Sequence, residues 1–169
     1  SGGGDSVALF YLLLGLRQSF RVLHFEHDGQ PEFASESRRF CENLCEENGV
    51  ELSVEKILGK QLASEGDLSW EAACRHLRYR SLKTREGLFL TAHTADAQAE
   101  TVVMRLLGGS GLAGLGGIYP TRDDGVARPL LCFSRDELRE YLRELGHIWL
   151  EDPTNVDGNE RALIRSAVM

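Results

Sequence analysis

The sequence has few lysines, no C-x-x-C pair and no long apolar run. Only 3 of the 19 basic residues are Lys, and the net charge of −7 excludes a uniformly basic domain that binds nucleic acid through its overall charge. The four cysteines, without C-x-x-C spacing, give no support to a zinc ribbon, a thioredoxin-like pair or a cluster, and we expect them to be small buried side chains. The longest nearly apolar run, residues 7–16, is about half of the ~20 residues that a membrane span requires. With no signal peptide visible, we expect a cytoplasmic protein with no membrane partner.

Helical and extended patterns alternate along the 169 residues, of which 42% are hydrophobic. The patterns predict helices over residues 5–17, 34–48, 69–84, 95–107, 134–145 and 159–168, strands over 20–26, 50–57, 88–92 and 127–133, an extended segment at 149–151, and loops over 58–68 and 108–117. This alternation predicts an α/β fold with a doubly wound parallel sheet. We expect one domain over residues 1–150 with its first strand upstream of Ser1, and residues 151–169 as a C-terminal extension of the same domain.

A glycine-rich loop leads into the first predicted helix. Glycines let backbone N–H groups close on an anion, serine hydroxyls add donors, and the helix N-terminus favours negative charge. The loop consists of Ser1, Gly2, Gly3, Gly4, Asp5 and Ser6. It lacks the Lys of a Walker A motif, so a metal must help to neutralise the phosphates, and Asp5 is the natural ligand for Mg²⁺. The S-G-G-x-D-S spacing resembles the pyrophosphate loop of the N-type ATP pyrophosphatases, which implies ATP as a ligand.

Further motifs follow in a fixed order. They occupy residues 71–75, 78–79, 91–101, 105–107, 109–115, 128–131 and 151–155. Together with the loop they resemble the tRNA(Ile)-lysidine synthetases from Ser1 to Arg165. The resemblance implies a Rossmann-like fold of the adenine nucleotide alpha hydrolase type and a carbon–nitrogen ligase of tRNA processing. Such an enzyme uses ATP to adenylate the wobble cytidine of an isoleucine tRNA with a CAU anticodon. It then attaches free L-lysine, which gives lysidine, AMP and pyrophosphate.

The resemblance also implies site residues. Those with catalytic roles are Asp5, His93, Asp96 and Glu100, and those expected to contact tRNA or phosphate are Arg75, Arg78, Arg128, Arg161 and Arg165. In a doubly wound sheet, the strand before His93 and the first strand flank the ligand crevice, so His93 and Asp96 should approach the loop. Glu100 follows Asp96 by four residues on the same helix face. For the arginines, a solvated basic face and ordinary salt bridges remain alternatives.

The sequence departs from the family at three places. Ala97 stands where the family usually has a second Asp, Ala162 stands where it usually has Asn, and residues 24–29 only partly match. Ala97 removes a carboxylate that could hold the lysine cation, which affects the second step and leaves adenylation intact. Two alternatives stay open: a tRNA thiolase with the same loop, and a nucleotide-binding module impaired in lysine transfer. The oligomeric state also stays open, with a dimer among the options.

Overall fold

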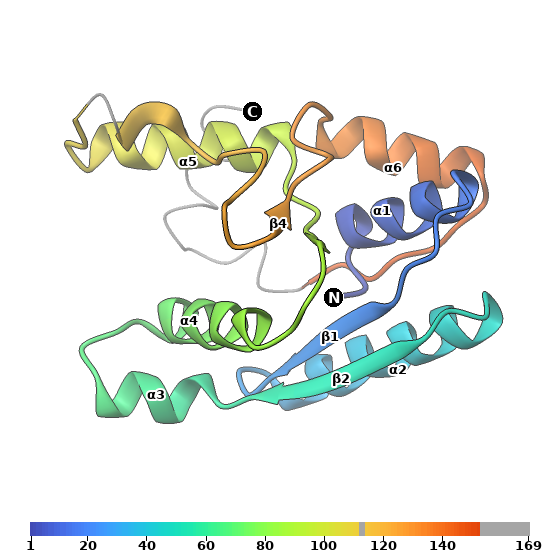
Figure 1. The fold of residues 1–169 in the computed structure, drawn as a ribbon, viewed down its shortest axis with the longest axis horizontal. Coiled ribbons are helices and arrows are strands. Elements are labelled where there is room, and N and C mark those ends of the chain that lie inside the picture. The colour runs from blue at the N-terminus through green and yellow to red at the C-terminus, as the bar shows by residue number, and fades with distance from the viewer. Residues whose placement is uncertain (112–113, 153–169) are drawn as a thin grey trace. The chain divides into compact units, whose positions relative to one another are not determined.

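The computed structural model describes residues 1–111 and 114–152 (Figure 1). Its strands pair in parallel, β1 with β2 and β3 with β4, and helices separate them along the chain, which confirms the predicted α/β class with parallel strands. Contacts divide the chain into two units, a first unit of residues 1–2 and 12–87 and a second unit of residues 3–11 and 88–169. None of the described helices has both the length and the apolar character needed to cross a bilayer.

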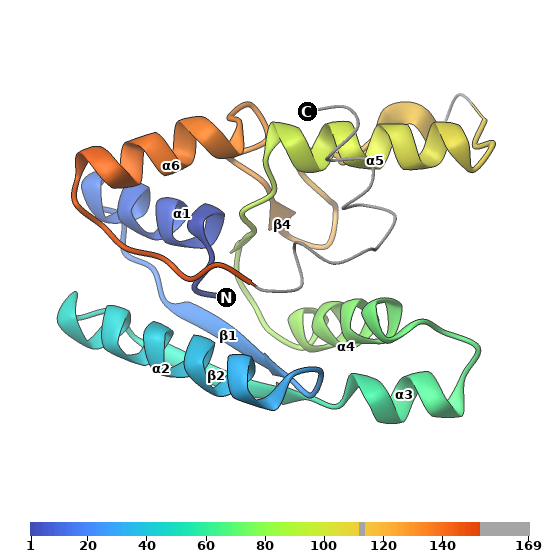
Figure 2. The ribbon, with the colours of Figure 1, turned by 180° about the vertical axis from the view of Figure 1, so that it is seen from behind.

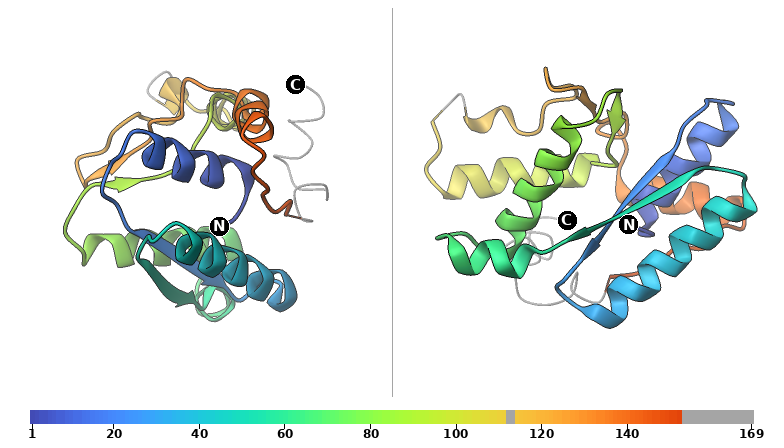
Figure 3. Two further views of the ribbon diagram at one scale, coloured as in Figure 1. Left: turned by 90° about the vertical axis from the view of Figure 1, so that its right-hand side faces the viewer. Right: turned by 60° about the horizontal axis from the view of Figure 1, so that its bottom comes forward.

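The first unit is built on two parallel strands joined by a helix. Strand β1 (Val22–His27) pairs with β2 (Leu52–Ile57) in the register Val22 to Leu52 through His27 to Ile57. The connecting helix α2 (Pro31–Glu47) starts earlier than predicted, because Pro31 suits the first turn of a helix. It runs alongside both strands and buries Cys41 and Cys45 (Figures 2 and 3).

Two glycines allow helix α4 (Trp70–Lys83) to approach the ends of these strands. Ser69 caps the helix by accepting a hydrogen bond from the N–H of Ala72, as its sequence predicts. A Cβ added at Gly29 would meet the Trp70 indole at 2.5 Å, and one at Gly59 would collide with the sulfur of Cys74. Close packing of α4 therefore depends on these two glycines.

Residues 58–68 do not form the predicted loop throughout, because α3 occupies Gly59–Glu65. The helix begins directly after β2, and the backbone N–H of Lys60 donates to Asp28 at 2.9 Å. Trp70 also donates from its indole nitrogen to Asp28, again at 2.9 Å. Both bonds join Asp28 to residues that are distant in the sequence. The local composition around residue 59 therefore gives no sign of the helix.

The second unit contains the start of helix α1 (Gly4–Gly15) and the C-terminal elements. The latter are β3 (Phe89–Leu90), α5 (Ala95–Leu107), a 3₁₀ turn (Gly114–Gly116), β4 (Val126–Ala127) and α6 (Arg135–Glu144). Helix α6 lies alongside the first turns of α1 (Figures 1 and 2). The core of the second unit includes Val7 and Phe10 of α1 and Leu138 and Leu142 of α6.

The strand predicted over residues 127–133 is wrong beyond its start. β4 ends at Ala127, Pro129 has no N–H to donate to a ladder, and turns follow, with a bond from Phe133 N–H to Leu130 O at 3.0 Å. Cys132 lies in these turns and is exposed, which contradicts its expected burial, whereas the other three cysteines are buried.

His24 is a buried histidine in the first unit. The residue is 2% exposed, and neither ring nitrogen has a hydrogen-bond partner among the described residues. Burial lowers the pKa of His24 to about 4. The unfolded chain would bind a proton near pH 6.5, so the folded state loses relative stability as the pH falls from 6.5 toward 4.

We expect His24 to account for about 2 kcal/mol of lost unfolding free energy between pH 7 and pH 5. The variant His24→Leu should therefore show a flatter dependence of stability on pH than the wild type, measured by urea unfolding at both pH values. His76→Gln, which changes an exposed histidine of α4, is the matched control and should keep the wild-type dependence. An unchanged dependence in His24→Leu would contradict the assignment.

Candidate functional site

The glycine-rich loop has the geometry of an anion cradle. Gly2 is buried and has φ of +73°, a conformation that favours glycine. The first bond of helix α1 runs from Val7 N–H to Gly3 O at 3.0 Å, so the N–H groups before it are directed out of the helix start. On the other side of the loop, Ser37 donates its hydroxyl to the carbonyl of Ser1 at 2.7 Å. The loop therefore presents backbone donors and a helix N-terminus, as the sequence predicts.

A second helix start follows β3, at the position predicted for His93 and Asp96. Thr94 is fully buried and caps α5 by accepting a hydrogen bond from the N–H of Ala97. His93 lies just before this cap, and its Nδ1 is 3.0 Å from the hydroxyl of Thr91. The cap fixes where α5 begins, so Asp96 lies in its first turn and Glu100 one turn further along.

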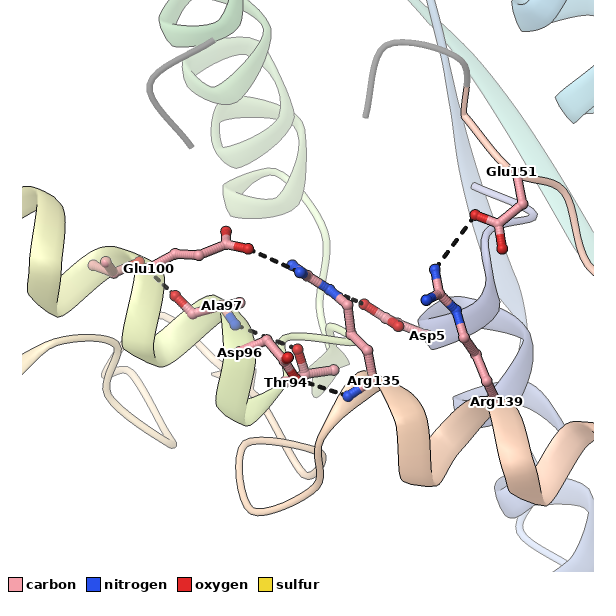
Figure 4. Close-up of polar contacts among 9 residues, drawn as sticks. Asp5, Thr94, Asp96, Ala97, Glu100, Arg135, Arg139 and Glu151 are labelled. Atoms are coloured by element: carbon pink, nitrogen blue, oxygen red, sulfur yellow. Dashed lines mark hydrogen bonds and ion pairs between the residues drawn. The ribbon is translucent and has the colours of Figure 1, made fainter. Parts of the chain in front are cut away.

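Arg135 joins the predicted carboxylates. Its guanidinium is 2.8 Å from Glu100 Oε1 and 3.7 Å from Asp5 Oδ2. Its backbone N–H donates to Asp96 Oδ2 at 2.7 Å. Figure 4 shows the side chain extending from the start of α6 to lie between Glu100 of α5 and Asp5 of α1. Arg135, which the motifs did not single out, thus connects Asp96 and Glu100 of α5 with Asp5 of the loop.

The environment of Arg135 favours its charge despite partial burial. Burial acts against the guanidinium, but the hydrogen bond and charge of Glu100, with the charges of Asp5 and Asp96, hold the pKa of Arg135 above its ordinary value. Glu100 is 1% exposed, so its carboxylate needs this cation. Among the described residues, the cluster consists of three carboxylates and one guanidinium, and these four groups together carry a net negative charge.

That charge fits a divalent cation bound together with phosphates. The described residues contain no group of three His, Cys, Asp or Glu side chains arranged to hold a metal on its own. Mg²⁺ usually takes one or two protein carboxylates and completes its shell with phosphate oxygens and water. Asp5, in the first turn of α1, can supply one such carboxylate beside the N–H groups that would face the phosphates.

The predicted arginines lie elsewhere. Arg75 and Arg78 belong to α4 of the first unit, where Arg75 is exposed with its guanidinium 5.0 Å from the ring centroid of Tyr79. Arg78 is largely enclosed, and burial, together with Arg75, lowers its pKa. Arg128 is 4% exposed and donates to the carbonyl of Tyr119.

Arg161 and Arg165 lie outside the described residues. The phosphate or tRNA contacts expected of all five arginines stay predictions. Of the three predicted arginines that the structure describes, Arg75 is exposed to solvent, whereas Arg78 and Arg128 are partly or fully buried.

The sequence did not predict a role for Arg135, because none of the motifs contains this residue. One physical signal could have indicated it. Ser134 and Glu137 form the predicted capping box, which places Arg135 at the first residue of α6. A cation there is unfavourable beside the positive end of the helix dipole, so it implies carboxylates nearby from other elements.

These features define the class of protein, a nucleotide-binding α/β domain. They are the parallel strands, the glycine-rich loop, and the carboxylates that cluster near the N-termini of α1 and α5. The chain matches the PP-loop domain family over residues 1–169, and it belongs to that family. This assignment confirms the predicted fold of the adenine nucleotide alpha hydrolase type.

Curated relatives carry one name. The chain is 41% identical over 162 residues to a tRNA(Ile)-lysidine synthase of Thermus thermophilus, which covers 93% of this chain and 31% of the relative. It is 35% identical to that of Bacteroides thetaiotaomicron, with 93% and 38% covered, and 37% identical to that of Methylococcus capsulatus, with 100% and 40% covered. The chain thus spans about a third of the length of these relatives.

A solved structure has a similar fold. It is the U34-tRNA thiolase of Methanococcus maripaludis, determined with its [4Fe-4S] cluster. The match covers 99% of this chain and 62% of the thiolase chain with a TM-score of 0.74 and 18% sequence identity. At this identity the likeness concerns the fold.

Replacing Arg135, the cation at the centre of the site, should destabilise the protein. Arg135→Ala removes the guanidinium that pairs with the buried carboxylate of Glu100, so we expect a loss of about 3–5 kcal/mol of unfolding free energy. Adding Glu100→Ala should recover part of that loss, because the buried carboxylate that paired with Arg135 is then gone as well. Chemical denaturation of the single and double variants measures both.

The control is Arg122→Ala, which breaks the more exposed pair with Asp124 and should cost at most about 1 kcal/mol. Equal losses of unfolding free energy in Arg122→Ala and Arg135→Ala would show that burial of Glu100 does not strengthen the contribution of its ion pair with Arg135.

Proposed function

We propose that this chain is the catalytic domain of a tRNA(Ile)-lysidine synthetase. The proposal is carried by one observation, the cluster of Asp5, Asp96 and Glu100 around Arg135 next to a phosphate loop without Lys. Membership in the PP-loop family and identities of 35–41% to relatives of that name support it. ATP, Mg²⁺, the isoleucine tRNA with its CAU anticodon and free L-lysine are the substrates and cofactor of the proposed reaction.

The first step requires charge stabilisation on a leaving group. The 2-carbonyl oxygen of the wobble cytidine attacks the α-phosphorus of ATP, and pyrophosphate leaves. In this proposal the N–H groups at the start of α1 bind the pyrophosphate oxygens, with Ser1 and Ser6 as added donors. Asp5 would hold Mg²⁺, which supplies further neutralisation of the phosphates.

The second step requires an unprotonated amine. The amine of lysine attacks C2 of the activated cytidine and AMP leaves. Lysine arrives as an ammonium ion, so a carboxylate or imidazole must hold it and take a proton. In this proposal Asp96 and Glu100 provide the negative charge, and His93, two residues before α5 in the same unit, accepts the proton. Arg135 orders both carboxylates for this task.

The tRNA needs positive contacts that the net charge of −7 does not provide. Exposed Arg75 can contact a phosphate of the tRNA, in keeping with the local positive contacts expected of an acidic domain. Arg78, Arg128, Arg161 and Arg165 complete the proposed set of phosphate-binding residues.

Two other functions have less support from the sequence and the structure. A thiolase of the solved kind carries a cluster, but this sequence has no C-x-x-C pair, and the described residues hold no cluster of possible metal ligands. A domain impaired in transfer is supported by Ala97 and Ala162 alone. Pyrophosphate release without lysidine would identify the impaired domain, and thiolated tRNA would identify the thiolase.

The phosphate loop gives the sharpest test of adenylation. Asp5→Asn removes its carboxylate while keeping side-chain size, so we expect loss of Mg²⁺-dependent pyrophosphate release with weak ATP binding retained. Pyrophosphate is measured in the intact protein with the tRNA and lysine present, at saturating Mg²⁺. Asp123→Asn, in the exposed turn before β4, is a matched control that should release pyrophosphate normally. A near wild-type rate for Asp5→Asn would refute the assignment.

A variant at Asp96 separates the two steps. Asp96→Asn keeps an oxygen that can accept from the Arg135 N–H and removes the charge meant for the lysine ammonium. We expect ATP affinity within about a factor of ten of the wild type, under ~1.4 kcal/mol, while lysidine formation fails. Equilibrium ATP binding and analysis of the modified nucleoside measure the two effects. A parallel collapse of ATP binding would reassign Asp96 to the nucleotide.

A further inference from the structure

The segment that follows α6 runs along the start of α1. We call residues 147–151 the strap. Leu150 forms a parallel bridge with Gly3 of the phosphate loop. Next to it, the Trp149 indole packs on Gly4, where an added Cβ would lie 3.4 Å from indole Cδ1 and 3.5 Å from Nε1. Further along α1, the Tyr11 ring stacks on His147 with centroids 3.4 Å apart. The strap thus contacts the backbone of the loop that faces the phosphates.

Three arginines of α6 face this region. Arg135, Arg139 and Arg143 are four residues apart, so they share one side of the helix. Arg135 binds the carboxylates of the site, Arg139 is 3.4 Å from Glu151 Oε2, and the Arg143 guanidinium lies 5.9 Å from the Trp149 ring centroid. The same helix that orders the site carboxylates therefore also holds the strap (Figure 4).

Glu151 connects the two contacts of the strap. Its Oε1 accepts the indole N–H of Trp149 at 2.7 Å, and its Oε2 pairs with Arg139. The Glu151 side chain is 63% exposed, and exposed ion pairs add at most about 1 kcal/mol to stability. These bonds therefore contribute little to folding. Their effect is geometric, because they fix the plane of an indole that lies against Gly4.

We propose that Glu151 is a positioning residue that holds Trp149 against Gly4 and so keeps the phosphate loop in the conformation that binds the triphosphate. The proposal rests on the proposed function insofar as ATP binds at this loop. Loss of the Glu151 contacts frees the indole and allows the loop to sample conformations that do not bind phosphate. Such a loop binds ATP more weakly, because only a fraction of molecules is competent, while bound ATP reacts at its usual rate.

Kinetics of the intact protein provide the first test. We expect Glu151→Ala to raise KM for ATP about five- to tenfold with kcat within about twofold, the size of one lost hydrogen bond. Glu151→Gln keeps an oxygen for the indole N–H and loses the pair with Arg139, so its KM should lie between those of Glu151→Ala and the wild type. Glu144→Gln, on the exposed side of the same helix, should match the wild type. An unchanged KM in Glu151→Ala, or a fall in kcat alone, would overturn the proposal.

Fluorine NMR of protein labelled with 5-fluorotryptophan provides the second test. If Glu151 only stabilised the fold, the Trp149 signal would not respond to a ligand at the phosphate loop. The Trp149 signal is assigned by its absence in Trp149→Phe. Magnesium pyrophosphate, the probe, should shift this signal in the wild type and in Glu144→Gln. In Glu151→Ala the free signal should already be displaced or broadened.

Calorimetry on the same samples separates failures of the two proposals. Pyrophosphate that binds without moving the Trp149 signal would overturn the role of the strap and leave the proposed function intact. The absence of both pyrophosphate and ATP binding would overturn the proposed function together with the role of the strap.

Discussion

The ion pair between Arg135 and the buried Glu100 is the interaction on which the rest of the site depends. A carboxylate that is 1% exposed is tolerable only with a cation beside it, and Arg135 reaches it from another helix. The same residue bonds Asp96 through its backbone and lies 3.7 Å from Asp5. One residue, through its side chain and its backbone, thus connects the N-terminal parts of three helices, α1, α5 and α6, within the second unit. Each of those starts favours negative charge, which makes three clustered carboxylates acceptable there.

The parts of the structure that follow from local chemistry were predictable from the sequence. Ser134 with Glu137 and Ser69 are capping residues whose bonds depend on neighbours a few residues away, and α6 and α4 begin where they indicate. Helix α5 has the predicted bounds, Ala95–Leu107. The approach of Asp96 to the loop was also predictable, because the topology of a parallel α/β fold sets it.

The remainder depends on contacts between distant residues. Helix α3 is joined to Asp28, and Arg135 is joined to Glu100 across 35 residues of sequence, so no local window contains either pair. Cys132 is exposed because Pro129 ends the expected strand early and turns follow. These are cases in which tertiary contacts or a single imino acid override a local pattern, and one sequence without its fold does not reveal them.

The absence of lysine from the phosphate loop has a chemical consequence. All three lysines of the chain, Lys56, Lys60 and Lys83, belong to the first unit, so the proposed phosphate site in the second unit would use backbone amides and arginine. Backbone amides and a guanidinium do not react with acyl donors at neutral pH, and neither loses its charge or dipole across the physiological range. The anion cradle should therefore withstand acetyl phosphate, acyl thioesters and other lysine-acylating metabolites. An enzyme whose phosphate loop uses an ammonium group is exposed to those same compounds.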